Sequence, residues 1–108
     1  GKRLISHCPN QILNIHPSLL PSFKGLNAQK QALDYGVRYT GCSVHFVTDE
    51  LDGGPIISQE IVEVLPHDTV ESLSNRILEK EHELYSKTID LISKNKVQLR
   101  DNKVFILN

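Results

Sequence analysis

The chain has 108 residues, of which 39% are hydrophobic, so it can bury one modest core and is expected to form one domain or part of one. Its net charge is -1 and it contains no basic run, which argues against a nucleic-acid partner. No stretch reaches the roughly 18 apolar residues of a membrane span. No signal-type apolar region follows Gly1, so a cytoplasmic protein is expected. Cys8 and Cys42 stand singly, which fits reduced thiols and gives no metal-ligand spacing.

The first expected strand covers residues 11–16. Side chains alternate along an extended chain, so this strand places Asn14 and His16 on one face. Prolines and a glycine then hold residues 17–26 in an irregular loop, because proline removes a backbone donor and restricts the residue before it. A short helix is expected over residues 28–35.

A second strand is expected over residues 42–48, with both faces at least half buried. The following loop at 49–55 combines carboxylates, paired glycines and a proline, a composition that suits special backbone geometry. A third strand is expected over residues 56–64.

The longest helix is expected over residues 68–93. Asp68 stands three residues before Glu71, which is the spacing of a capping box at the start of a helix. The apolar stripe of this helix passes through Glu81, and a carboxylate is out of place on a face that packs against a sheet. Residues 97–107 are expected to form a terminal hairpin.

The polar pair Asn14 and His16 lies at the carboxyl end of its strand, where open α/β sheets place their ligand crevices. Spacing alone favours packing or capping roles for this pair. Residues 49–54 hold three carboxylates and two glycines. They form either an acidic surface turn, which is the simpler interpretation, or a backbone cradle for a polar heterocycle. Their spacing does not match a calcium-binding EF-hand.

Three further polar residues have competing interpretations. Glu81 either reaches solvent or a basic partner from a buried stem, or contacts a ligand. His45 is expected to pack as a half-buried histidine with its hydrogen bonds satisfied, because no second histidine has the spacing of a zinc site. Ser43 lacks the glycine-flanked elbow of hydrolase nucleophiles, which argues against serine hydrolysis.

Two strings make the sequence recognisable. Residues 14–21 read NIHPSLLP and residues 43–55 read SVHFVTDELDGGP. Together they resemble the phosphoribosylglycinamide formyltransferase family, over a span from about residue 12 to residue 92. The resemblance implies an α/β fold, the carboxy-terminal half of a formyltransferase-type mixed sheet flanked by helices, with a long C-terminal helix and a terminal hairpin. Residues 1–108 are then the catalytic and folate-binding part, and the amino-terminal nucleotide-binding half is expected to be absent.

The resemblance implies a catalytic trio of Asn14, His16 and Asp52. The residues that it places against a substrate are Ile15, Pro17 and Glu81 for glycinamide ribonucleotide, and Thr48, Asp49, Glu50, Leu51, Asp52 and Gly53 for the folate. The reaction implied is formyl transfer from 10-formyltetrahydrofolate, as co-substrate, to the amine of glycinamide ribonucleotide in purine biosynthesis. No metal is expected.

Three rival functions stay open. Formyltetrahydrofolate deformylase is a hydrolase that shares the Asn-x-His and Asp pattern, although Pro17 after His16 favours the transferase. Methionyl-tRNA formyltransferase ranks lower, because it needs a basic loop for its nucleic-acid partner. A fragment that binds folate without catalysis is the third alternative, and this fragment alone is expected to be inactive. The oligomeric state stays open, with a homodimer as one option, and the Leu20-Pro21 peptide bond is expected to be cis.

Overall fold

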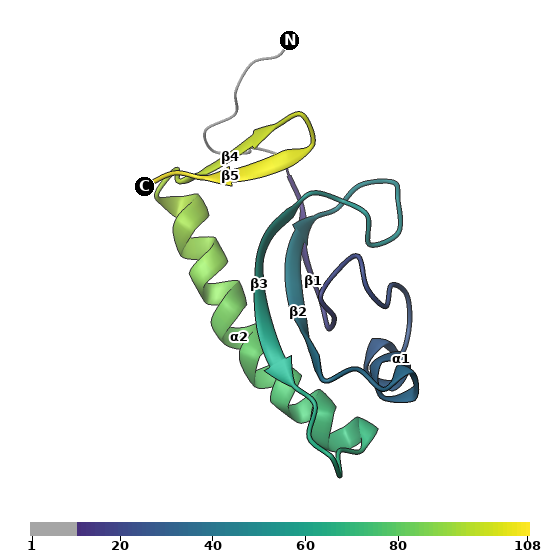
Figure 1. The fold of residues 1–108 in the computed structure, drawn as a ribbon. Coiled ribbons are helices and arrows are strands. Elements are labelled where there is room, and N and C mark those ends of the chain that lie inside the picture. The colour runs from purple at the N-terminus through teal and green to yellow at the C-terminus, as the bar shows by residue number, and fades with distance from the viewer. Residues whose placement is uncertain (1–10) are drawn as a thin grey trace.

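The computed structural model describes residues 11–108, so the expectations for Gly1 and Cys8 lie outside the described residues. The elements, in chain order, are β1 (Leu13–His16), α1 (Ala28–Tyr35), β2 (Tyr39–Phe46), β3 (Ile56–Glu63), α2 (Val70–Ser93), β4 (Val97–Arg100) and β5 (Lys103–Ile106). β1, β2 and β3 form an antiparallel sheet with β2 in the centre, whereas β4 and β5 form a separate hairpin (Figure 1). The expected α/β class is confirmed.

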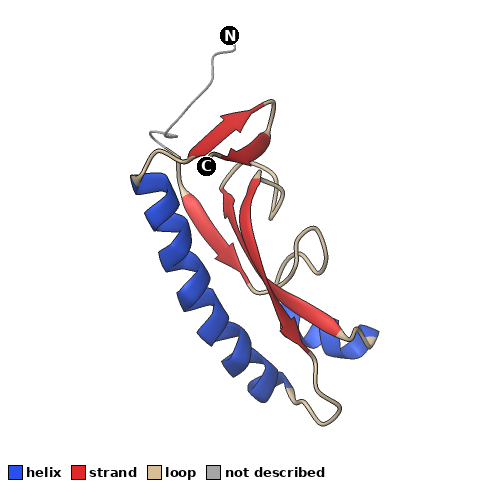
Figure 2. Cartoon of the chain, turned by 60° about the vertical axis from the view of Figure 1, so that its left-hand side comes forward, coloured by secondary structure: helices blue, strands red, loops and turns tan. Residues whose placement is uncertain are grey.

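The central strand β2 is buried on both faces, which fixes the layers of the fold. Cys42, Val44 and Phe46 point toward α2 and are at most 1% exposed. Ser43 and His45 point to the opposite face and are also buried. α2 packs along the first face, and the loop after β1 lies with α1 on the second (Figure 1 and Figure 2). This arrangement places the polar face of β1 under that loop.

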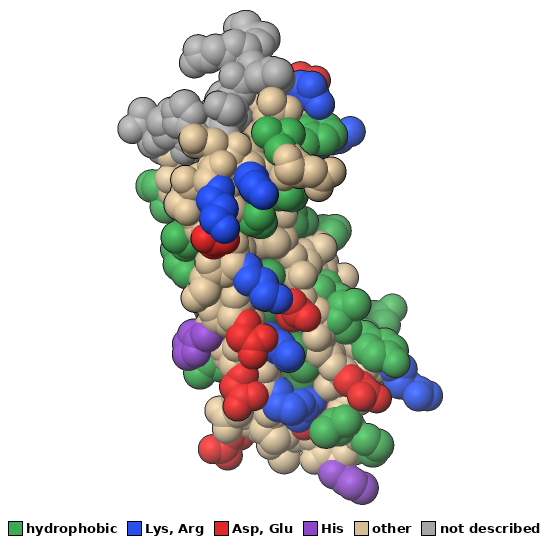
Figure 3. Space-filling model, turned by 90° about the vertical axis from the view of Figure 1, so that its left-hand side faces the viewer, with side chains coloured by type: hydrophobic (Ala, Val, Ile, Leu, Met, Phe, Trp, Pro, Cys, Tyr) green, Lys and Arg blue, Asp and Glu red, His purple; other side chains and the backbone are tan. Residues whose placement is uncertain are grey.

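The helix α2 is amphipathic along its 24 residues. Its buried residues are Leu73, Ile77, Leu84 and Thr88. The Thr88 hydroxyl lies 2.5 Å from that of Ser58 on β3 and donates to the Leu84 carbonyl, so its polar group is satisfied inside the core. The outer face of the helix mixes acidic and basic side chains (Figure 3), which is typical of a solvated surface. No helix within residues 11–108 is long and apolar enough to cross a membrane.

The start of α2 differs from the expectation. Thr69, not Asp68, is the N-cap, and it forms a reciprocal capping box with Ser72 rather than with Glu71. Asp68 lies one residue further out and accepts hydrogen bonds of 2.7 Å from both terminal nitrogens of Arg76. These hydrogen bonds hold the pKa of the Asp68 carboxyl well below its usual range. Asp68 therefore pairs with Arg76 and does not cap the helix.

The strand limits in the structure also differ from the predicted limits by a few residues. β2 begins at Tyr39, earlier than expected, because the long strand β3 offers it pairing partners as far as Glu63. The expected terminal hairpin is confirmed, with Asp101 and Asn102 at positive φ of 53° and 64° in its turn. The Leu20-Pro21 peptide bond is cis, as the family resemblance implies.

Candidate active site

β1 and β2 bring the predicted polar residues together. The antiparallel register places Asn14 opposite His45 and His16 opposite Ser43, so all four side chains share the face covered by the loop. His16 is 6% exposed, whereas Asn14 remains exposed. The alternation of side chains along β1 is therefore as predicted, and it delivers an amide and an imidazole to one side of the sheet.

Both ring nitrogens of His16 face protein acceptors. Nε2 lies 2.9 Å from the carbonyl oxygen of Phe23, in the loop after β1. Nδ1 lies 3.6 Å from Oδ2 of Asp52, and both side chains are less than a tenth exposed. The imidazole therefore lies between a backbone carbonyl and a carboxylate, which together fix the orientation of the ring.

Asp52 is held by backbone geometry as well as by His16. It sits in the loop after β2 at a positive φ of 50°, a conformation that aspartate tolerates better than most residues. Its Oδ2 also accepts a 2.7 Å hydrogen bond from the amide of Gly25. The His16 and Asp52 pair is thus fixed by two backbone groups of one loop, the Phe23 carbonyl and the Gly25 amide.

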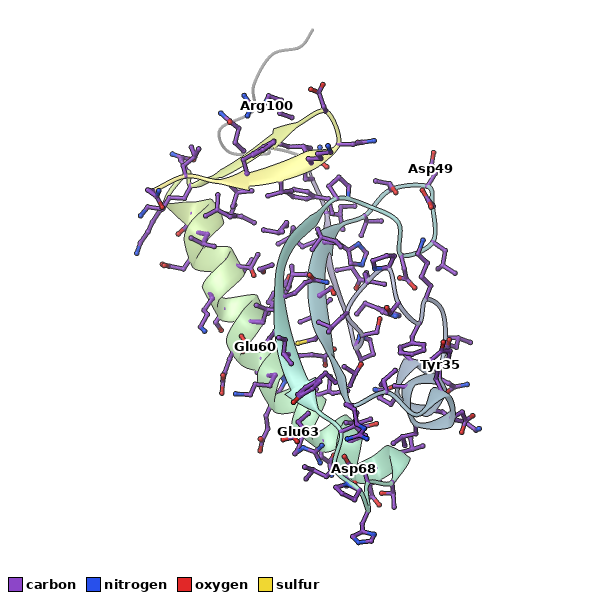
Figure 4. The ribbon with its side chains drawn as sticks, in the orientation of Figure 1. Tyr35, Asp49, Glu60, Glu63, Asp68 and Arg100 are labelled. Carbon is purple, nitrogen blue, oxygen red and sulfur yellow. The ribbon has the colours of Figure 1, made fainter. Side chains whose placement is uncertain are left out.

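The loop after β2 borders a small cavity of about 270 Å³. Its lining residues are Asn14, His45, Val47, Thr48, Asp49, Glu50, Leu51 and Asp52. Most of the predicted folate contacts are thus gathered here, beside the Asn14 side chain. Gly53 is the exception, because it lines a different cavity between this loop and β5. Figure 4 marks the loop by Asp49.

Glu81 borders a second cavity, of about 520 Å³, between α2 and β1. Asn14 and Ile15 line it as well, because β1 is the edge strand among the described residues. Burial raises the pKa of Glu81, and electrostatic interactions with the nearby His82 and His16 oppose this rise. Glu81 therefore lies within the electrostatic reach of the His16 site. Asn14 lines both cavities.

His45 and Ser43 belong to the same polar face of the sheet as Asn14 and His16. His45 is 3% exposed, and its Nδ1 lies 3.1 Å from the Phe46 carbonyl. Its Nε2 has no hydrogen-bond partner within residues 11–108, so the expectation of a fully satisfied histidine is wrong for this nitrogen. The Ser43 hydroxyl donates to the Ser18 carbonyl and accepts from the Leu20 amide, a structural role that fits its rejection as a nucleophile.

Some predicted or relevant residues stand apart from the cavities. Pro17 directly follows His16 but lines neither cavity. Phe23 and Gly25 contribute through their backbone, which the sequence reasoning missed, because any residue carries those groups. The glycine at position 25 is the signal in the sequence that could have marked this loop, since its backbone adopts a left-handed φ of 83°. In the described part of the chain, no group of three or more His, Cys, Asp or Glu side chains could hold a metal ion.

Comparison with known proteins gives this geometry a family. The family model described as formyl transferase matches residues 1–89. The chain belongs to the formyl transferase family. It is 56% identical over 89 residues to the trifunctional purine biosynthetic protein adenosine-3 of Gallus gallus, covering 82% of this chain and 9% of that protein. It is 41% identical over 102 residues to phosphoribosylglycinamide formyltransferase of Escherichia coli, covering 94% of this chain and 48% of the relative.

Solved structures of formyl transferases have the same fold. Glycinamide ribonucleotide transformylase 1 from Symbiobacterium toebii matches with a TM-score of 0.89 and 54% identity, over 93% of this chain and 47% of that one. A formyltetrahydrofolate deformylase from Pseudomonas syringae matches with a TM-score of 0.87 but only 35% identity, over 93% of this chain and 34% of that one. The chain thus resembles the transformylase more closely in sequence, and it spans about half the length of the bacterial transformylase.

Proposed function

We propose that the protein transfers a formyl group from 10-formyltetrahydrofolate to the amine of glycinamide ribonucleotide, a step of purine biosynthesis. One observation carries this proposal. Asn14 lines both the cavity bordered by the loop after β2 and the cavity bordered by Glu81, and it is on the same strand face as His16, which pairs with Asp52. Two substrates that occupy these two cavities would meet at this amide.

The first part of the proposed reaction is attack by the amine nitrogen on the formyl carbon. A bond forms between these two atoms, and the carbonyl oxygen becomes the oxyanion of a tetrahedral intermediate. The Asn14 amide and a protonated His16 would donate hydrogen bonds to this oxyanion. In the structure Nε2 of His16 contacts the Phe23 carbonyl, so the oxyanion would compete with that carbonyl for the same N–H.

The second part is collapse of the intermediate. The bond between the formyl carbon and N10 of the folate breaks, and the product amide keeps the formyl group. The attacking amine has to lose a proton, and N10 has to gain one. Asp52 is the group proposed to pass protons through water, because its carboxylate lies beside His16 and lines the cavity next to Asn14.

The residues proposed to contact the substrates line the two cavities, apart from Pro17 and Gly53. Glu81 and Ile15 would contact the ribonucleotide, where a carboxylate with a raised pKa can accept hydrogen bonds from its amine and hydroxyl groups. Pro17 would border the same substrate from the end of β1. The residues proposed to receive the pterin ring, largely through backbone groups, are Thr48, Asp49, Glu50, Leu51, Asp52 and Gly53.

The place of this chain in the whole enzyme is also part of the proposal. Residues 1–108 would be the carboxy-terminal catalytic and folate-binding part, and a nucleotide-binding half elsewhere in the protein would hold the substrate phosphate. The coverage of 48% of the Escherichia coli relative supports this division. A cytoplasmic location is also proposed, because the substrates of such an enzyme are soluble metabolites.

Hydrolysis of formyltetrahydrofolate is the second candidate, favoured by the structural match to a deformylase. One assay separates the two functions in the complete protein. Release of tetrahydrofolate from 10-formyltetrahydrofolate is followed with and without glycinamide ribonucleotide, and the formylated ribonucleotide is identified by mass spectrometry. Transfer predicts that release depends on the ribonucleotide. Equal release without it would refute the transferase and favour the hydrolase.

A further inference from the structure

The loop after β1 holds the proposed catalytic pair through two backbone groups that lie two residues apart. The Phe23 carbonyl faces Nε2 of His16, and the Gly25 amide donates to Oδ2 of Asp52 at 2.7 Å. A backbone N–H keeps its direction only if the peptide planes around it are fixed. The position of Asp52 therefore depends on what fixes the backbone on either side of Gly25.

Gln31, in the first turn of α1, forms hydrogen bonds to the backbone on both sides of Gly25. Its Nε2 donates to the Lys24 carbonyl at 2.9 Å and to the Leu26 carbonyl at 3.0 Å. These two carbonyls flank Gly25, whose φ of 83° is a left-handed conformation. One amide group thus uses both of its hydrogens to fix the residues before and after the Asp52 contact. Figure 4 shows α1, marked by Tyr35, beside this loop.

The helix itself shows that this contact is specific to one side chain. Gln29 is two residues away on the same helix and has the same amide, yet it makes no hydrogen bond to the loop. The N-cap Asn27 does not bond the helix end with its side chain either. Gln31 is therefore the side chain of α1 that ties the helix to the carbonyls around Gly25.

We propose that Gln31 is a positioning residue for Asp52, acting through the Gly25 amide without touching either substrate. The inference rests on the proposed function, because Asp52 is assigned to proton transfer there. Gln31 is absent from the linings of the cavities at Asn14 and Glu81. Its loss should therefore lower turnover and leave folate binding intact, since misplacement of a reacting group by about 1 Å costs up to about 100-fold in rate.

The test uses Gln31→Glu in the complete protein, with Gln29→Glu as the matched control. Glutamate keeps the length of the side chain, but its carboxylate cannot donate and repels the two carbonyls. Both variants add one negative charge to the same helix. Gln31→Met, which has no donor and no charge, serves if Gln31→Glu does not fold. Thermal unfolding of each variant checks that the fold is retained.

Two readouts are measured for each variant. The NMR signal of the Gly25 amide proton should move upfield and exchange faster in Gln31→Glu, and stay unchanged in Gln29→Glu. The kcat for formyl transfer should fall about tenfold in Gln31→Glu, with KM for 10-formyltetrahydrofolate within about twofold of the parent. Gln29→Glu should keep both constants.

The outcomes separate this inference from the proposed function. An unchanged Gly25 amide in Gln31→Glu would overturn the positioning contact, whatever the kinetics. A changed amide with unchanged kcat would overturn the positioning role. A parent protein that transfers no formyl group would refute the proposed function instead, and the NMR comparison would still report on the contact itself.

Discussion

The adjacent glycines Gly53 and Gly54, which end the loop after β2, should respond very differently to one added methyl group. A Cβ on Gly54 would overlap the carbonyl oxygen of Phe46 and lie 2.9 Å from its carbonyl carbon. These are backbone atoms of β2, and the Phe46 amide is itself bonded to the Pro55 carbonyl at 2.9 Å. The atoms nearest to a Cβ on Gly53 belong to the side chain of Glu50, which is 70% exposed and can turn away.

The two substitutions differ only in the space around the new atom, because neither glycine has a left-handed φ. Overpacking costs about 1–3 kcal/mol, and Gly54→Ala belongs at about 3 kcal/mol because strand backbone has to move. At about 2–4 °C per kcal/mol for a domain of 150–250 residues, the melting temperature of the complete protein should fall by about 6–12 °C. Gly53→Ala should stay within about 1 kcal/mol of the parent, since alanine also restricts the unfolded chain.

The backbone shift caused by Gly54→Ala should also displace Asp52, the residue proposed to transfer protons. Asp52 precedes Gly54 by two residues, and a shift of about 1 Å at a reacting group costs up to about 100-fold in rate. The measurements are thermal unfolding by circular dichroism and single-turnover formyl transfer, both in the complete protein. Gly54→Ala should lose stability and rate together, whereas Gly53→Ala should keep the melting temperature of the parent. Equal melting temperatures for the two variants would refute the reasoning from backbone contact.

Three further perturbations test other parts of the site and core. His16→Ala or Asp52→Asn should lower turnover by about 100-fold with little change in melting temperature, and near-normal turnover in either variant would contradict the assignment. Because the pKa of Asp68 is lowered, its ionised form stabilises the fold above about pH 4, and this contribution is lost as the pH falls through the pKa of the folded state. Asp68→Asn should therefore lower the free energy of unfolding by about 2 kcal/mol at pH 7 and by progressively less in acid, and a loss that does not change with pH would contradict this. Burial raises the pKa of Cys42 to about 12, so iodoacetamide should not label it in the folded protein at pH 8, and rapid labelling there would contradict its burial.

Much of the scaffold could be predicted from the sequence because periodicity encodes burial. The alternation along β1 correctly placed Asn14 and His16 on one face, and the apolar stripe of α2 located its buried side. Glu81 stood out because it interrupts that stripe, and it does border a cavity. The start of α2 was predicted one residue too early, at Asp68, whose carboxylate binds the Arg76 guanidinium eight residues along the chain instead of capping the helix. The local sequence does not show whether such a carboxylate will bind the helix end or a guanidinium.

The approach of Asp52 to His16 could not be predicted from spacing, since 36 positions separate them and the connecting loops have no period. Only the resemblance to a family brought them together in advance. The unpartnered Nε2 of His45 was equally hidden, because satisfaction of a buried nitrogen depends on which groups from other elements surround it. Alternation could predict that His45 faces the site, but not what meets its ring.

The side chains of the site can be recognised in the sequence, but the backbone groups that orient them cannot. The Phe23 carbonyl and the Gly25 amide orient the proposed catalytic pair, yet every residue has a carbonyl and nearly every residue has an amide. What the sequence can specify is the means of fixing them, a glycine where φ is positive and a glutamine amide that spans two carbonyls. Substitutions at Gln31 should therefore alter the chemistry from a position that touches neither proposed substrate.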